Sequence, residues 1–138
     1  MRQRHRNVFG ILGCMLLFAA NGCNFGNDSL ERYELSGAVT YDGKPIPYGE
    51  ISFAPDTAKG NSGPGAVATI LEGAYHVTGE KGLIGGPHVI TVTGYTGVPD
   101  NAAVMAGTAS QPKPLFAPFS TSDDLPRGDA THDVEIPK

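Results

Sequence analysis

The stretch Leu35–Pro47, with the sequence LSGAVTYDGKPIP, is the part of the chain that decides the fold class. Its first seven residues alternate with a period of two, and one face is formed by Leu35, Gly37, Val39 and Tyr41. This period is typical of a half-buried β-strand. The dipeptide Asp42-Gly43 follows, and both residues tolerate the positive φ of a tight hairpin turn. We therefore expect a strand and a turn here, with Lys44-Pro45-Ile46-Pro47 running extended into the next strand.

Further strand patterns follow along the chain. We expect Ile51 and Phe53 to face inward on a second strand and Glu72-Gly73 to join two more strands in a hairpin. The other expected strands cover residues 66–71, the segment carrying Tyr75 and Val77, residues 88–95, and the closing segment 131–136. Apolar spacing typical of helices is not sustained anywhere after Tyr33. These patterns predict an all-β fold, an antiparallel β-sandwich of about seven strands.

Loops separate the expected strands. Residues 56–64 and 78–86 are loops by composition, because they combine glycine with polar residues or proline and lack an apolar period. Residues 97–128 contain five prolines, and we expect an irregular, partly ordered excursion there. Leu115, Phe116 and Phe119 are the side chains expected to hold it against the domain.

The first 22 residues have the pattern of a bacterial export signal. A basic start that contains Arg2, Arg4 and Arg6 precedes an apolar run from Val8 to Ala20. That run is shorter than the ~20 residues a membrane-spanning helix needs. Small residues before Cys23 resemble a lipobox, which predicts that a diacylglyceryl group is attached to the Cys23 thiol and that the signal is cleaved before it. A soluble secreted protein cut near the same place, or an uncleaved anchor, is the alternative.

The sequence predicts three parts. Residues 1–22 are a lipoprotein signal peptide, residues 23–32 are the lipidated Cys23 with a polar linker, and residues 33–138 are the β-sandwich domain. Cys14 leaves with the signal and Cys23 carries lipid, so neither is left for a disulfide or a thiolate metal site. Several acyl chains on one cysteine give stable membrane attachment. We expect an exported protein, lipid-anchored to a membrane of the bacterial cell envelope.

Length and charge exclude several function classes. With 138 residues the chain allows one ordinary domain, which excludes a multidomain enzyme. A formal net charge of −4 argues against nucleic-acid binding. No βαβ spacing or phosphate-binding loop is present, since GLIGG at residues 82–86 lacks the Lys-Ser/Thr continuation.

Three candidate chemistries can be weighed from the residues. His76, His88 and His132 lie on expected strands without metal-ligand spacing, and we expect His88 and His132 to be partly buried. A carbohydrate platform would use the exposed Tyr48, whereas Tyr41, Tyr75 and Tyr95 are expected in the core or at strand edges. A calcium site would use the late aspartates, which are Asp123, Asp124, Asp129 and Asp133. No serine lies in a nucleophile elbow, so no catalytic residue is assigned.

Four motifs occur in order: LSGAVTYDGKPIP at 35–47, GEISF at 49–53, GAY at 73–75 and GPHVITV at 86–92. Together they resemble the carboxypeptidase regulatory-like domain family, and the chain looks like the short bacterial lipoproteins built from one such domain. The resemblance implies a prealbumin-like (transthyretin-like) seven-stranded sandwich that serves as a non-catalytic accessory or adhesive module. His88 departs from the family's aromatic at that step, and the 97–128 excursion is longer than the usual connection.

We therefore expect a non-catalytic, membrane-anchored envelope lipoprotein with a structural or binding module. The membrane is its partner through the N-terminal lipid, and an envelope protein or a polysaccharide is a further candidate partner. No cofactor, resident metal or small-molecule substrate is assigned. The alternative function is a small carbohydrate- or calcium-binding surface module.

Overall fold

A computed structural model describes residues 30–138 of the chain. Backbone pairing begins at Tyr33, whose N–H donates to Leu83 O at 2.8 Å and whose carbonyl accepts from Leu83 N at 3.0 Å. In this described part no helix has the length and apolar character needed to cross a membrane. The expected signal peptide and Cys23 lie outside the described residues.

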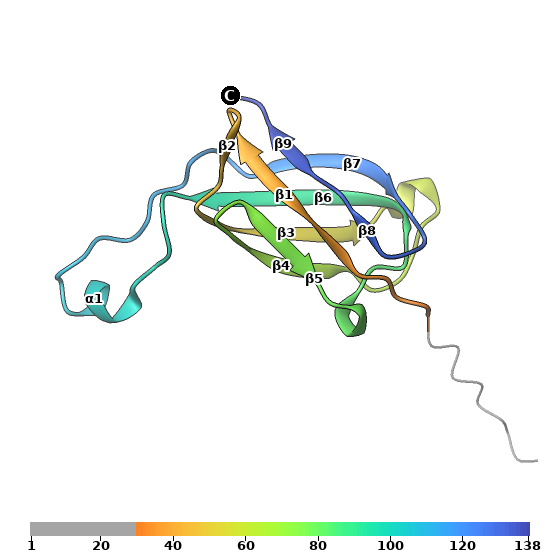
Figure 1. The fold of residues 1–138 in the computed structure, drawn as a ribbon, viewed down its shortest axis with the longest axis horizontal. Coiled ribbons are helices and arrows are strands. Elements are labelled where there is room, and N and C mark those ends of the chain that lie inside the picture. The colour runs from red at the N-terminus through yellow and green to blue at the C-terminus, as the bar shows by residue number, and fades with distance from the viewer. Residues whose placement is uncertain (1–29) are drawn as a thin grey trace, which may run out of the picture.

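Strands are the main regular elements of the described residues (Figure 1). The strands are β1 Leu35–Tyr41, β2 Lys44–Pro45, β3 Tyr48–Pro55, β4 Ala66–Leu71, β5 Ala74–Val77, β6 Gly86–Tyr95, β7 Phe119–Leu125, β8 Ala130–Thr131 and β9 Val134–Ile136. One five-residue helix, α1, spans Asn101–Met105, and two 3-10 turns span Thr57–Lys59 and Gly79–Lys81. The all-β prediction is confirmed.

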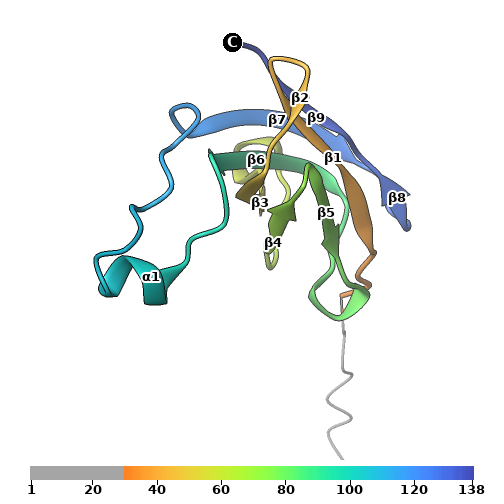
Figure 2. The ribbon, with the colours of Figure 1, turned by 60° about the vertical axis from the view of Figure 1, so that its left-hand side comes forward.

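The strands form one curled sheet in the order β2-β1-β5-β4-β3-β6-β7, with β8 and β9 paired to β1 (Figure 2). Neighbours in that order are antiparallel, as expected. β8 and β9 are parallel to β1, which the sequence analysis did not anticipate.

Two hairpin turns lie where the sequence predicts them. Asp42 and Gly43 have φ of 52° and 71°, and Glu72 and Gly73 have φ of 50° and 79°. Positive φ at both central residues matches the right-handed twist of the flanking strands, which favours two-residue turns of this kind. Both turns were therefore readable from the sequence.

β1 changes partners along its length. Its first half pairs with β5 and β8, whereas its second half pairs with β2 and β9. Gly37 lies just before this change, and a Cβ atom added there would meet the carbonyl oxygen of His132 well inside contact distance. Gly37 is therefore a point of close contact between β1 and the C-terminal segment.

The sheet curls around a core of alternating strand residues. Ile51 and Phe53 on β3 are buried, as predicted, and the Phe53 and Tyr75 ring centroids are 5.7 Å apart. The other fully buried large side chains are Val39, Ile46, Ile70, His88, Ile90, Val92 and Ile136. On β3, β4 and β6 the intervening residues face outward and form an outer face of the sheet.

Residues 97–128 are more ordered than the sequence analysis expected. β7, Phe119–Leu125, lies inside this range and pairs with β6 from Gly86↔Leu125 to Val92↔Phe119. This strand could not be recognised from its sequence, FSTSDDL, because most of its residues are polar. An edge strand tolerates such residues on its exposed positions. The irregular excursion is thus confined to the segment between β6 and β7, where α1 lies.

The expected closing strand at 131–136 is divided by His132 and Asp133. His132 N donates to Ser36 O at 2.8 Å, and Asp133 Oδ1 accepts from Ala38 N at 2.7 Å. Between β8 and β9, these two bonds hold the chain against β1 in place of regular strand pairing. His132 consequently lies between the two strands and not on one.

Burial of Tyr75 predicts a loss of stability at alkaline pH. Desolvation raises the pKa of the Tyr75 hydroxyl above its ordinary 10.0, with the Asp133 charge adding to the shift, and the hydroxyl donates to His132 O at 2.7 Å. Because the unfolded state ionises first, stability is retained below about pH 10 and falls above it by up to ~1.4 kcal/mol per pH unit. Urea denaturation between pH 8 and pH 11 measures this slope.

The matched variant is Tyr75→Phe, which keeps the ring and removes the ionisable group. We expect it to lose about 0.5–1.5 kcal/mol at pH 8, because one hydrogen bond is removed, and to show a shallower alkaline decline. Equal slopes for the two proteins would contradict the assignment to Tyr75.

Candidate functional site

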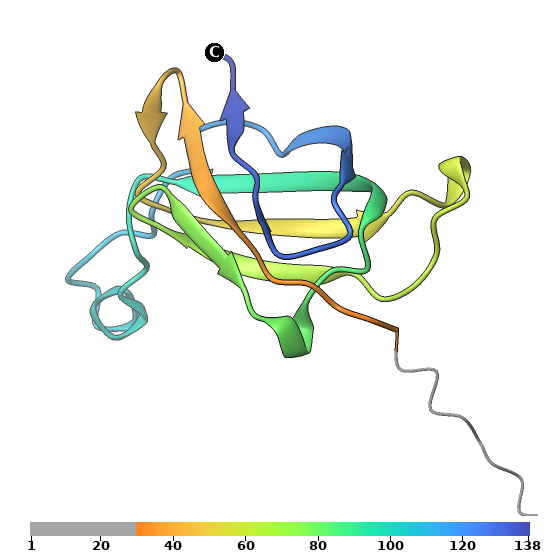
Figure 3. The same cartoon turned by 45° about the vertical axis from the view of Figure 1, so that its right-hand side comes forward.

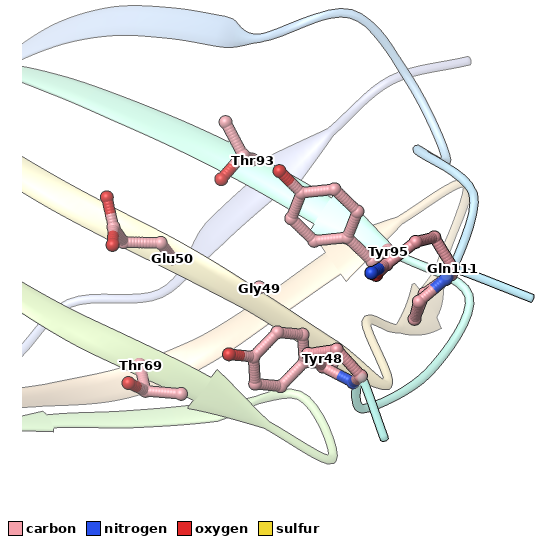
Figure 4. Close-up of a pocket in the computed structure, with 9 residues that line it drawn as sticks. Tyr48, Gly49, Glu50, Thr69, Thr93, Tyr95 and Gln111 are labelled. Atoms are coloured by element: carbon pink, nitrogen blue, oxygen red, sulfur yellow. The ribbon is translucent and has the colours of Figure 1, made fainter. Parts of the chain in front are cut away.

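A groove of about 500 Å³ lies on the outer face of β3, β4 and β6 (Figure 4). We call it the outer groove. Its lining residues are Tyr48, Gly49, Glu50, Thr69, Thr93, Tyr95, Pro99, Gln111 and Pro112. Six of them come from the three strands and three from the excursion between β6 and β7.

Strand register assembles the floor of the outer groove. Tyr48 on β3 is opposite Tyr95 on β6, and Glu50 is opposite Thr69 on β4 and Thr93 on β6. Residues two apart on a strand share a face, so an aromatic row lies beside a row of Thr69, Glu50 and Thr93.

The two tyrosines form a tilted aromatic pair. Their ring centroids are 6.2 Å apart with an interplanar angle of 41°, and both residues are half-buried. In Figure 4 both hydroxyls point toward the side where Thr69, Glu50 and Thr93 lie. The expectation that Tyr48 is surface-accessible is thus met only in part, because Tyr95 packs beside it.

The remaining tyrosines lie elsewhere. Tyr75 is in the core, as expected, and half-buried Tyr41 packs against Phe116 with centroids 4.9 Å apart. Tyr95 is on the outer face of the sheet, where β6 ends. Of the four tyrosines weighed in the sequence, two therefore contribute to the outer groove.

The wall of the outer groove is held by a hydrogen-bonded stem. Thr96 N donates to Lys113 O at 3.0 Å, Lys113 N donates to Thr96 Oγ1 at 3.1 Å, and Leu115 N donates to Gly94 O at 2.9 Å. Gly94 also leaves the space that the Phe116 ring occupies, since a Cβ there would be 2.8 Å from that ring. The stem fixes the start and end of the excursion against β6, and with them the wall residues.

Polar side chains of the outer groove are free to bind a ligand. Within residues 30–138, no hydrogen bond or ion pair engages the side chains of Tyr48, Glu50, Thr69, Thr93, Tyr95 and Gln111. Hydroxyls both donate and accept, the carboxylate of Glu50 accepts only, and the amide of Gln111 does both. The groove therefore offers a complete set of uncommitted hydrogen-bonding groups next to two aromatic rings.

The histidines are engaged separately. His76 Nε2 is 3.5 Å from Glu34 Oε2, and His132 Nε2 is 3.6 Å from Asp123 Oδ2. His88 is fully buried, more than expected, with Nδ1 at 2.8 Å from Gly86 O and Nε2 without a partner in the described part of the chain. His132 is partly buried, as expected. In the described part of the chain the three histidines therefore have separate partners.

The late aspartates hold backbone in place. Asp129 Oδ1 accepts from Glu34 N at 2.8 Å, Asp133 Oδ1 accepts from Ala38 N at 2.7 Å, and Asp123 Oδ1 accepts from Asp124 N at 2.8 Å. Over residues 30–138 no three His, Cys, Asp or Glu side chains are grouped so that they could hold a metal ion. Asp129 and Asp133 instead join the C-terminal segment to the chain around β1.

Comparisons of the chain with known protein families, with curated proteins and with solved structures found no match in any of the three. Cys23, the expected lipidation site, is outside the described residues, whereas Tyr48 lies in the outer groove.

Sequence reasoning missed most of the outer groove. Glu50 and Thr93 were not singled out, and Tyr95 was assigned to the core or a strand edge. One signal was present: Tyr48 and Glu50, like Thr93 and Tyr95, occupy the outward positions of alternating strands. The wall residues Pro99, Gln111 and Pro112 carried no comparable signal.

Proposed function

We propose that the chain is an exported bacterial envelope lipoprotein whose β domain is a non-catalytic binding module. The observation that carries the binding role is the outer groove, with six polar side chains that make no hydrogen bond or ion pair within residues 30–138. Export and lipidation are supported by the basic, apolar and lipobox-like segments that end at Cys23.

The fold proposed for this module is a prealbumin-like β-sandwich, as in the carboxypeptidase regulatory-like domains that the sequence resembles. Support comes from the connection between β4 and β5, which pair only at Leu71↔Ala74. The strands β4, β3, β6 and β7 can then be counted as one layer and β5, β1 and β9 as the other. Strands that change partners, as β1 does, are a feature of sheets folded over on themselves.

The arrangement of the chain suits a tethered binding module. Residues 30–33 enter at one end of the domain, and the excursion that carries α1 projects from the opposite end (Figure 3). The outer groove lies at the end with the excursion, since Pro99, Gln111 and Pro112 line it. The groove is therefore remote from the end of the domain where the chain enters.

Cys23→Ser tests the anchor. We expect the variant to lose labelling by an alkyne-tagged fatty acid and to move from the membrane fraction to the soluble fraction, because the thiol is the acylated atom. Cys14→Ser is the matched control, and it should label and fractionate as the wild type does. A wild-type chain that remains unlabelled, or a Cys23→Ser variant that labels normally, would refute the lipid anchor.

A further inference from the structure

We infer that the outer groove binds a segment of a neutral polysaccharide. The inference rests on the proposed binding function and specifies its ligand class and its site. It is drawn from three features of the groove, namely its aromatic row, its polar row and its charge.

The aromatic row fits the apolar faces of sugar rings. Pyranose rings present C–H groups on their faces and hydroxyls around their edges, so they stack on aromatic rings while their hydroxyls remain available. Tyr48 and Tyr95 supply two such rings, with centroids 6.2 Å apart. The tilt of 41° makes this row a curved support that suits a chain of rings better than one flat ligand.

The polar row fits the hydroxyls at the edges of the sugar rings. Glu50 lies between Thr69 and Thr93 across the three strands, and Gln111 adds an amide from the wall. A carboxylate can accept from two neighbouring hydroxyls at once, and such charge-assisted bonds are stronger than neutral ones. Opposite charges often face each other across strands, yet Glu50 makes no ion pair within residues 30–138. Its acceptor sites are therefore uncommitted.

The charge of the groove selects neutral chains over anionic ones. No Lys, Arg or His is among its nine lining residues, and Glu50 is its one ionisable carboxylate. The whole chain also has a formal net charge of −4. A uronic, sulfated or phosphorylated glycan would meet repulsion without any compensating cation in the groove.

The size of the groove favours a polysaccharide segment over a protein surface. A volume of about 500 Å³ falls in the ~300–1,000 Å³ range of small-ligand sites. Stable protein interfaces need about 800 Å² on each partner and draw on a cluster of buried apolar anchors. The lining has two aromatic residues and no aliphatic anchor other than Pro99 and Pro112.

Affinity electrophoresis tests the inference with the full chain, purified in detergent. Native gels contain galactomannan, dextran or hydroxyethyl cellulose as neutral probes and alginate as the anionic probe. We expect at least one neutral polymer to retard the protein and alginate to leave its mobility unchanged. Retardation by none of the neutral polymers, or a preference for alginate, would overturn the inference.

Variants of the groove locate the site. Tyr48→Ala, Tyr95→Ala and Glu50→Gln should each weaken the affinity about tenfold, a change that corresponds to ~1.4 kcal/mol. Glu50→Gln is isosteric and exposed, so it tests the site without a large effect on folding. The matched controls are Glu135→Gln, an exposed glutamate on β9, and Tyr33→Ala, which is outside the groove; both should bind like the wild type.

The outcomes separate this inference from the proposed function. If Glu50→Gln and both tyrosine variants bind as the wild type does, the polysaccharide binds elsewhere and the inference fails. If the lipidated chain binds a protein but no glycan, the tethered binding module stands and the inference fails. If Cys23 is not acylated but the groove variants lose glycan affinity, the anchor fails and the inference stands.

Discussion

Gly37→Ala should destabilise the domain by about 3 kcal/mol. The added methyl would collide with the carbonyl of His132, whose carbon would be 2.7 Å away, and it would lie 3.1 Å from the Tyr75 ring. Backbone cannot move aside as a flexible side chain can. Overpacking with backbone displacement costs about 1–3 kcal/mol, and each buried hydrogen bond lost adds ~1 kcal/mol.

The bonds at risk in Gly37→Ala join β1 to the C-terminal segment. Ser36 O accepts from His132 N at 2.8 Å, and His132 O accepts from the Tyr75 hydroxyl at 2.7 Å. Moving His132 away from β1 would strain both bonds and loosen the parallel pairing of β8 and β9. The expected loss is therefore cooperative, since one displacement affects several contacts.

Urea denaturation of the full chain measures the loss at Gly37. Gly128→Ala is the matched control, because a Cβ there would meet nothing within 4 Å and its φ is not in the left-handed region. We expect that control to change stability by no more than ~0.5 kcal/mol. Equal midpoints for the two variants would show that β1 and the His132 segment do not pack closely.

Local chemistry made several parts of the fold predictable. Asp42-Gly43 favours a tight turn because both residues tolerate positive φ, and Gly73 does the same at the second hairpin. The same holds for β6, whose residues 90–93 are β-branched and strand-forming. In each case the information lies within a few neighbouring residues, which is why one sequence was enough.

Strand β7 and the parallel strands β8 and β9 depend on distant partners. β7 is polar, and what makes it a strand is its pairing with β6. β8 and β9 pair with β1 in parallel, and beside them Asp129 and Asp133 accept backbone N–H groups of Glu34 and Ala38. The periodicity of the sequence does not predict hydrogen bonds between residues so far apart in the chain. From the sequence, Asp129 and Asp133 were weighed as calcium ligands with Asp123 and Asp124, because the four carboxylates cluster along the chain.

The outer groove also combines a residue that could be predicted locally with residues that depend on distant partners. Tyr48 was singled out from the sequence because it follows a proline and was expected at the surface. Its neighbours in space come from β4, from β6 and from residues beyond β6. Only the register places Tyr95 beside Tyr48 and Glu50 between two threonines. Such a site needs the sheet order before it can be recognised.

Phe53→Ala should cost about 3–5 kcal/mol, the usual range for removing a large side chain from a core. Phe53 is 1% exposed, and its ring packs 5.7 Å from that of Tyr75, so it connects β3 to β5 across the curled sheet. Neighbouring core side chains can fill the resulting cavity only in part. Because whole domains are stable by only ~5–15 kcal/mol, this one change removes a large share.

Val67→Ala is the matched control for Phe53→Ala. Val67 lies on β4 one position beyond Ala66, the partner of Phe53, and its side chain faces outward with 58% exposed. We expect Val67→Ala to change the free energy of unfolding by no more than ~0.5 kcal/mol in urea. Folded Phe53→Ala should still bind glycan, because Phe53 faces inward whereas the groove lies on the outer face. A loss of stability as small as that of Val67→Ala would mean that the space around Phe53 is not a packed core.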